Sequence, residues 1–456
     1  MSFLIEEALR GAGVGAVFLV IFAAAEAWRR LGSPEPEWTR KLVHLGGGVV
    51  SLALPWLVRS HWTVLALGLA FAGVLLLTRR LGVLESVHGV ERVSEGGLYF
   101  PLAIYAMFLL AADRPVFYLI GVLALVVSDA LAALVGTTYG KMRFRVERDR
   151  RSVEGSAVFF LATFLAVHLP LLLMTDLDRL LSVLVAVQIA LLVTFLELIS
   201  LRGNDNLIVP IGTYLLLLKL TPQMPETILW QLVAQLAILG CLFLVAWRSR
   251  LLTGSGTIAA SLFFYGAWSL GGPAWVVAPA AALLAFGLVV RFARTFDHKP
   301  SARYQVLAVF YTGIVGAVLF IANNVLETVV RHPVWGWGDP LYPVFLGALA
   351  ANLALLTLVF WTDTPWIRRV SGLQLLGSVA LGAGVLIPLG GWVHPHMSLA
   401  QGLLAAAVPL LAAGVYLAAN RLPNVPRRRP WDGRLQSLSV AASVLLLLPL
   451  FLAAHA

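Results

Sequence analysis

Long apolar runs are the feature that most constrains this chain. Sixteen of them approach the roughly 20 residues that an α-helix needs to cross a bilayer. They cover approximately residues 11–28, 43–58, 62–78, 97–112, 115–139, 156–174, 180–199, 207–220, 227–247, 255–271, 273–290, 304–322, 342–361, 371–389, 398–420 and 435–454. Hydrophobic residues make up 60% of the 456 residues and charged residues only 12%, which excludes a water-soluble domain. The sequence predicts an all-α, polytopic transmembrane helical bundle of 14–16 spans.

The distribution of lysine and arginine predicts the orientation of the spans. If the N-terminus lies outside, the loops assigned to the cytoplasm carry 27 of the 33 Lys and Arg residues. Cytoplasmic loops of membrane proteins are enriched in these residues, so both termini are expected on the non-cytoplasmic side. The formal net charge of +10 reflects the same bias, and no nucleic-acid partner is expected.

The polar and charged residues that look chemical are concentrated before about residue 250. We therefore expect a catalytic transmembrane domain over residues 1–250 and a second transmembrane domain, degenerate or scaffolding, over residues 251–456. No low-complexity linker separates the two halves.

The first half is organised around residues 128–155. This stretch places Asp129, next to Ser128, inside an otherwise apolar run. Small residues follow at Ala132, Gly136 and Gly140, with a spacing that lets another helix approach one face. A basic loop comes next and ends at a second acid, Glu154, followed by Gly155. The cations of this loop are Lys141, Arg143, Arg145, Arg148, Arg150 and Arg151. An intramembrane acid, a cation cluster and a second acid indicate a site for a metal-bound polyphosphate.

Each of these residues also has a purely structural interpretation. An acid at the centre of a membrane helix costs about 2.5–3.5 kcal/mol on insertion scales, so Asp129 needs either a function or an ion-pair partner. The basic loop satisfies the inside-charge rule without binding anything. Lys141 and Arg151 are the phosphate-binding candidates because they flank the acids.

Three further loops fall at the same predicted face of the membrane. They supply Arg40, Lys41, His44, Glu95, Glu197, Asp205 and Asn206. His44 is either part of the site or an interfacial side chain. Asn206 and its neighbours are typical of a turn, but Glu197 lies just inside the preceding apolar run, where an acid is unusual.

Several common motifs are absent. The GTTYGKM segment at 136–142 has one residue too few between its glycines for a Walker loop and no Ser or Thr after the lysine.

Intramembrane acids in glycine-rich helices also fit an ion-coupled secondary transporter, which we keep as an alternative.

Five segments in order resemble the phytol kinase and dolichol kinase group, which is related to phosphatidate cytidylyltransferases. They are RKLVH at 40–44, SEGGLYFPL at 94–102, SDALAALVGTTYGK at 128–141, RSVEGS at 151–156 and ELISLRGNDNLIVP at 197–210. The resemblance covers roughly residues 38–220. It implies transfer of a phosphoryl group, commonly from CTP, to the hydroxyl of an isoprenoid alcohol at the cytoplasmic face. The signature of the cytidylyltransferases is not found, although such an activity is a second alternative.

The resemblance also implies roles for the candidate residues. Asp129, Glu154 and Glu197 would be catalytic, with Asp129, Glu154 and Asp205 holding Mg²⁺. Arg40, Lys41, His44, Lys141 and Arg151 would bind the nucleotide phosphates. Ser128, Gly136, Gly140, Gly155, Asn206 and Glu95 would shape the site. Whether Asp129 is base or metal ligand stays open at this stage.

Residues 250–320 more distantly resemble the phytyl-phosphate kinase family, through LLTGSGTIAASLFFYG at 251–266 and SARYQVLAVFYTG at 301–313. That family's later intramembrane Asp-Thr, followed by a Glu, is replaced here by ANLALLTLVF. Asp363 comes late, in a loop with Arg368 and Arg369. The second half is therefore expected to lack a kinase site.

Overall fold

A computed structural model describes residues 2–32, 36–81, 96–147, 149–294, 304–330, 339–362, 372–420 and 433–455. The chain forms two compact units, Met1–Leu232 and Val233–Ala456, each with its own core. The division falls inside one helix, earlier than the boundary near residue 250 expected from composition. Glu95, Asp363, Arg368 and Arg369 lie outside the described residues.

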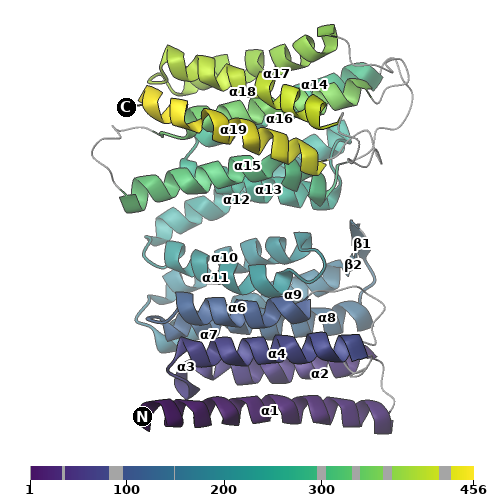
Figure 1. The fold of residues 1–456 in the computed structure, drawn as a ribbon, viewed down its shortest axis with the longest axis vertical. Helices are drawn as coiled ribbons and strands as arrows, with labels where there is room; N and C mark the ends of the chain where they lie inside the picture. Colours follow the sequence, from purple (N-terminus) through teal and green to yellow (C-terminus); the bar gives the residue numbers. More distant parts are fainter. Residues whose placement is uncertain are drawn as a thin grey trace. The chain divides into compact units, whose positions relative to one another are not determined.

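Unit 1 consists of helices that run side by side, with one small hairpin at an end (Figure 1). In chain order its elements are α1 (Ser2–Gly32), α2 (Pro36–Leu52), α3 (Leu54–Leu57), α4 (His61–Leu81), α6 (Gly96–Leu110), α7 (Pro115–Leu123), η1 (Ala124–Ser128), α8 (Asp129–Thr138), β1 (Arg143–Val146), β2 (Asp149–Ser152), α9 (Val153–Met174), α10 (Arg179–Ile199), α11 (Asp205–Leu220) and the start of α12 (Pro225–Ser249).

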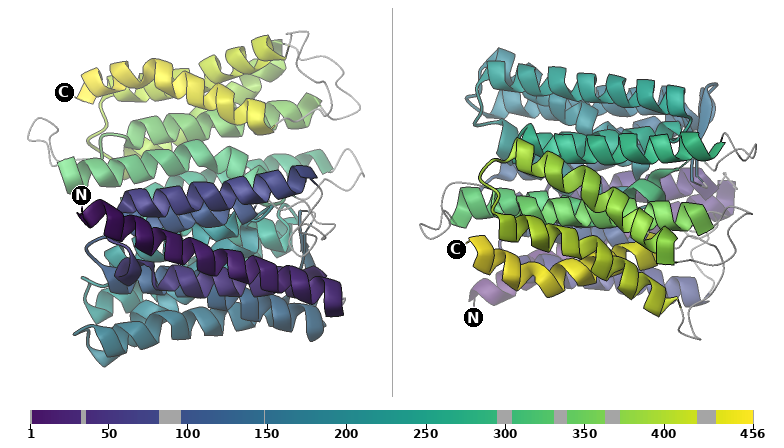
Figure 2. Two further views of the ribbon diagram at one scale, coloured as in Figure 1. Left: turned by 60° about the horizontal axis from the view of Figure 1, so that its bottom comes forward. Right: turned by 90° about the horizontal axis from the view of Figure 1, so that it is seen from above.

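Unit 2 is built in the same way, and its helices keep their side-by-side arrangement in both views of Figure 2. After the rest of α12 its elements are α13 (Gly254–Gly271), α14 (Ala274–Arg294), α15 (Val306–Val325), η2 (Leu326–Val330), α16 (Tyr342–Thr362), α17 (Gly372–Val393), α18 (Leu399–Ala419) and α19 (Gly433–His455).

The prediction of a helical polytopic membrane protein is confirmed. Every apolar run found in the sequence lies in helical structure, because each run is long and contains few backbone-breaking residues. Among the described residues, 12 helices are long and apolar enough to cross a membrane, and α6 is a shorter apolar helix. The run at 43–58 is divided between α2 and α3, with Pro55 in the first turn of α3. The expected number of spans and the orientation stay predictions.

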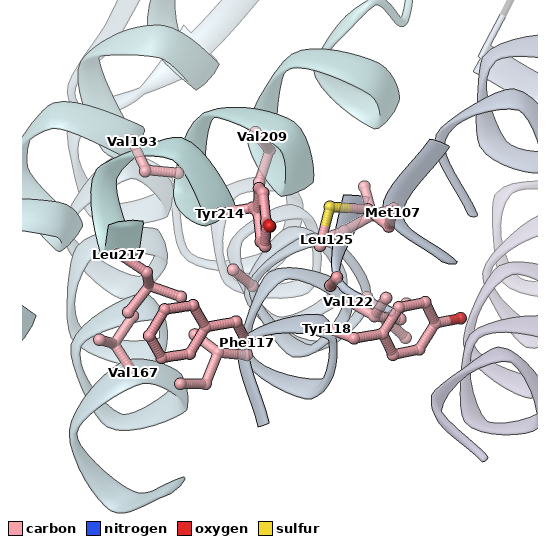
Figure 3. Packing of buried hydrophobic residues seen from close by; sticks show 14 of the residues in the cluster. Met107, Phe117, Tyr118, Val122, Leu125, Val167, Val193, Val209, Tyr214 and Leu217 are labelled. Atoms are coloured by element: carbon pink, nitrogen blue, oxygen red, sulfur yellow. The ribbon is translucent and has the colours of Figure 1, made fainter. Parts of the chain in front are cut away.

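One helix in each unit is more deeply buried than the other spans. In α10 the membrane-length window is 67% buried, and in α16 it is 89% buried, whereas most other spans bury far less. Figure 3 shows how large side chains from several helices fill the core of unit 1. Phe117 packs edge-on against Tyr214 there, and both lie beside Leu217. This packing fixes the helix ends that carry the candidate site.

The basic loop contains structure that the sequence did not reveal. Residues 143–146 and 149–152 form a two-stranded antiparallel hairpin, which is the exception to the all-α class. Directly paired residues share a face of a hairpin. Phe144 pairs with Arg151, and Val146, which is fully buried, lies on that same face. The pairs Arg145–Arg150 and Arg143–Ser152 lie on the other face.

The hairpin joins two helices that approach each other closely. A Cβ atom added to Gly155 of α9 would lie 3.0 Å from the Ala132 carbonyl oxygen of α8 and 3.2 Å from Gly136 Cα. The small residues expected on this face of α8 therefore receive α9. Ser152 begins α9, and its side chain accepts a hydrogen bond from the Gly155 amide at 3.1 Å.

We predict that Gly155→Ala lowers the stability of the folded chain by about 1–3 kcal/mol, because the new methyl group meets a backbone carbonyl that cannot rotate away. Thermal unfolding of the detergent-solubilised protein measures the effect. The control is Gly240→Ala in α12, where nothing lies within 4 Å of an added Cβ. Alanine there should be neutral or slightly stabilising. Equal melting temperatures for Gly155→Ala and wild type would contradict the close packing of α8 on α9.

Candidate active site

The predicted site residues that the structure describes all belong to unit 1. They lie on α2, in η1 and α8, between α8 and β1, on β2 and the start of α9, at the end of α10, and at the start of α11. Figure 1 shows the hairpin at the same end of unit 1 as the Gly32 end of α1.

Asp129 directly follows a short π-helical turn, η1. Such turns insert an extra residue into a helix and are frequent at functional sites. The inserted turn packs against α2, since a Cβ atom at Gly48 would lie 2.3 Å from Val126 Cγ1. This close approach brings the α2 side chains next to Asp129. The α7–η1–α8 segment remains one apolar stretch from Pro115 to Thr138.

Asp129 is paired with a cation from α2. Its Oδ2 lies 2.9 Å from Lys41 Nζ and 3.6 Å from His44 Nε2. Lys41 and His44 are three residues apart, so they share one face of α2. The Asp129 side chain is 29% exposed and that of Lys41 18%, so the pair is reachable but shielded. Asp129 therefore has an ion-pair partner, and this pairing does not exclude catalysis.

Two polar atoms beside this pair retain hydrogen-bonding capacity. Within the described part of the chain, His44 Nε2 and Ser128 Oγ are buried and have no hydrogen-bond partner. Buried polar groups are normally satisfied, so both atoms are available to bind water or a ligand. The His44 ring also packs edge-on against Phe100, which holds its orientation. Arg40 lies half-buried on the same helix.

Arg151 and Glu197 form a second ion pair. An Arg151 guanidinium N–H donates to Glu197 Oε1, and its other terminal nitrogen donates to the Ser200 carbonyl at 3.0 Å. Both side chains are largely buried, with exposed fractions of 13% and 11%. Arg151 makes this contact because it lies on the inward face of the hairpin, whereas Arg145 and Arg150 lie on the other face and are exposed. The pair ties β2 to the end of α10.

Glu154 lies at the base of the hairpin. Its Oε1 accepts hydrogen bonds from the backbone amides of Lys141 and Met142, both at 3.0 Å. These bonds close the turn between α8 and β1. In the same described segment the Lys141 ammonium forms no ion pair or hydrogen bond with the chain. The Lys141 side chain is thus exposed and available to an external anion.

The Asp205 region is dominated by turn chemistry. Asp205 Oδ1 accepts a hydrogen bond from the Asn206 amide at 3.1 Å, and Gly203 adopts a positive φ of 87°. Asn206 Nδ2 donates to the Gly96 carbonyl at 2.9 Å and so links α11 to α6. The role predicted for Asn206 in shaping the site is compatible with this bond.

The acids predicted to hold Mg²⁺ have different partners. Among the described residues, no three His, Cys, Asp or Glu side chains gather in a way that could hold a metal ion. Asp129 contacts Lys41, while Glu154 and Asp205 bind backbone amides. The described residues therefore form no ready-made protein cage for a metal ion.

Comparison with known proteins identifies the family. No family model and no solved structure matches the chain. A curated protein from Synechocystis sp., phytol kinase, is 36% identical over 207 residues, which cover 45% of this chain and 88% of that relative. The chain therefore belongs to the phytol kinase family.

Proposed function

We propose that this protein is a membrane-embedded kinase that transfers a phosphoryl group from a nucleoside triphosphate, CTP by preference, to the hydroxyl of an isoprenoid alcohol. Family membership supports the phosphotransferase class. The observation that carries the proposal for this chain is the Lys41–Asp129–His44 cluster, which holds a charged pair inside an apolar membrane-length segment. An acid placed there is expensive and is usually retained for function.

The placement of Asp129 suits a substrate that arrives from the bilayer. Asp129 begins α8, which ends nine residues later at Thr138, or roughly 14 Å along the helix. Lys141 and the hairpin follow that end. A lipid hydroxyl would meet Asp129 and His44, and the water-soluble donor would meet Lys141 near the hairpin. His44 Nε2 or the Asp129 carboxylate would accept the alcohol proton as the phosphoryl group is transferred.

Phosphoryl transfer mostly requires positioning and neutralisation of charge. Mg²⁺ usually binds one or two carboxylates together with substrate phosphates and water. The described acids fit that mode better than an all-protein site. The metal, when bound, would neutralise charge on the triphosphate. Asp129 is the carboxylate we assign to it, and Lys141 and Lys41 are the cations next to the phosphates.

We also propose that sixteen spans cross the membrane, with both termini outside and this site at the cytoplasmic face. The asymmetry of lysine and arginine supports this orientation. The nucleotide would then reach the hairpin from the cytosol.

We predict that the purified chain moves the labelled γ-phosphate of CTP onto an isoprenoid alcohol, and that Asp129→Asn lowers turnover by about 10²–10⁴-fold because it removes the charge that accepts a proton or binds the metal. The matched control, Asp176→Asn, changes an exposed acid in the loop between α9 and α10 and should be silent.

The labelled nucleotide also separates the alternatives. Incorporation of label from the cytidine moiety would indicate a cytidylyltransferase, and incorporation of neither label would reopen the transporter hypothesis. Near wild-type turnover of Asp129→Asn would remove Asp129 from the site.

A second prediction separates phosphate binding from structural pairing. Lys141→Gln should reduce kcat/KM roughly 10- to 150-fold with no change in stability, since a lost charge-assisted contact is worth about 1.5–3 kcal/mol. Arg151→Gln should instead lower stability, because it leaves the buried Glu197 carboxylate without its cation. Arg145→Gln, on the exposed face of the hairpin, is the control and should change neither quantity.

The double variant Arg151→Gln/Glu197→Gln completes this test. If the pair is only structural, the double variant should recover stability and turnover together. If Arg151 also binds phosphate, stability should recover while the apparent KM for the nucleotide stays raised. Loss of stability in Lys141→Gln would contradict our assignment of Lys141.

We further predict that the protein makes a monophosphate and no diphosphate. The second half lacks the carboxylates expected of a second kinase site in its ANLALLTLVF segment. The assay supplies isoprenoid monophosphate with nucleotide and Mg²⁺ and measures diphosphate. Diphosphate formation that Asp363→Asn abolishes, with the first step intact, would show that residues 251–456 are an active kinase.

A further inference from the structure

Unit 2 contains an apolar cavity that the kinase proposal does not use. The cavity has a volume of about 130 Å³ and is partly open. Its walls come from α13, α14, α15 and α16 and from the segments that precede α13 and α15. Figure 1 shows α13 beside α15, and α15 also packs on α16. The described residues that line the cavity all belong to unit 2.

Backbone hydrogen bonds and aromatic packing hold one end of the cavity in place. The Tyr304 carbonyl accepts the backbone N–H of Thr253 at 3.0 Å, and the Tyr304 N–H donates to the Leu251 carbonyl at 2.9 Å. These bonds join the segments before α13 and α15. The ring of Phe286 packs edge-on against Tyr304, with centroids 5.6 Å apart. This end of the cavity is therefore built by contacts within the chain and needs no ligand to form.

The size of the cavity favours an occupant from the bilayer. An empty cavity destabilises a protein, because the atoms that line it lose packing contacts. An apolar cavity of about 150 Å³ holds a benzene-sized molecule. The space in unit 2 is similar, so it can hold one branched five-carbon unit of a hydrocarbon chain. Its opening leaves a path for the rest of that chain.

The walls of the cavity are uncharged. The described residues that line it are Leu, Ala, Val, Phe, Pro, Gly, Tyr, Thr and Asn, and none of them carries a charged side chain. A phosphate, carboxylate or ammonium group would lose its water there without meeting an opposite charge, which is unfavourable. The cavity therefore favours a neutral ligand.

Two polar side chains in the wall have unused hydrogen-bonding capacity. Asn352 is buried on α16; its Nδ2 donates to the Ala348 carbonyl at 3.1 Å, and its Oδ1 accepts from Gln436 Nε2 at 2.9 Å. A side-chain amide has two N–H donors and two acceptor sites, so in the described chain one of each is left. The Thr312 hydroxyl donates to the Ala308 carbonyl at 2.9 Å, and its oxygen accepts no hydrogen bond from the described residues. A ligand hydroxyl, which both donates and accepts, matches these groups.

We propose that this cavity binds a neutral isoprenoid alcohol. The alcohol hydroxyl accepts an N–H from Asn352 Nδ2 and donates to Thr312 Oγ1, and the adjoining isoprene unit fills the apolar part of the cavity. The choice of an isoprenoid among neutral alcohols rests on the proposed function of unit 1, whereas the existence of the site does not. Residues 251–456 thus bind a ligand although their ANLALLTLVF segment lacks the acids of a kinase site.

The test counts the molecules of tritium-labelled geranylgeraniol that bind to the purified full-length protein in detergent. Ala282→Phe places a ring in the cavity and should lower the count by one molecule per chain. Ala380→Phe, at an exposed position of α17 outside the cavity, is the control and should bind as the wild type does. Because the result is a difference between variants, it does not depend on whether unit 1 binds the alcohol. Failure of the proposed kinase function is detected separately, as absence of phosphoryl transfer.

Thr312→Val tests the polar part of the site, because valine keeps the shape of threonine without its hydroxyl. Loss of one hydrogen bond to the alcohol should weaken binding in the cavity about 2- to 13-fold. Thr328→Val is the matched control. The Thr328 hydroxyl also donates to the carbonyl four residues earlier, but it lies outside the cavity, so the affinity should not change.

Competition experiments test the chemical class of the ligand. The label that Ala282→Phe loses should be displaced by unlabelled geranylgeraniol and not by geranylgeranyl monophosphate, because the cavity offers no cation. Displacement by the monophosphate would overturn the assignment to a neutral ligand. Equal displacement by oleyl alcohol would overturn the choice of an isoprenoid.

Equal counts of bound alcohol in wild type and a folded Ala282→Phe would overturn the site itself. If Ala282→Phe does not fold, the unaltered protein decides the question. Geranylgeraniol with a diazirine close to its hydroxyl should label α15 or α16 on irradiation. Labelling confined to unit 1 would contradict the proposal.

Discussion

The first unit depends on the neutralisation of one carboxylate within an apolar helix. Asp129 is tolerated there because Lys41 lies 2.9 Å away on α2. An acid without such a partner would be costly to keep in the membrane. The pairing requires α2 to pack tightly on η1, where Gly48 leaves room for Val126. The same packing places His44 beside the acid, so the structural requirement and the proposed chemistry use the same contacts.

The hairpin after α8 places the cations of the basic loop in different environments. Strand alternation points Arg151 inward to Glu197 and leaves Arg145 and Arg150 exposed. Glu154 accepts the amides at the base of the hairpin, while Lys141 stays available. Residues of the same charge therefore have different roles. Arg151 joins β2 to α10, and Lys141 can bind an anion.

The helices could be predicted from sequence because each apolar run is long enough to be helical and carries few competing signals. The need for a partner at Asp129 was also predictable, since burial of an acid has a known cost. The hairpin was not, because its strands are charged and only four residues long. The pairs Arg151–Glu197 and Asp339–His394 join residues far apart in sequence, so tertiary packing creates them.

Because a π turn precedes Asp129, the direction of its carboxylate depends on the number of residues in that turn. One residue corresponds to about 100° of rotation in an α-helix. Loss of a single residue within Ala124–Ser128 would regularise the helix and keep its hydropathy, yet it would turn the Asp129 carboxylate about a quarter of a circle or more away from α2. Insertions and deletions there would change the site without changing any of its residues.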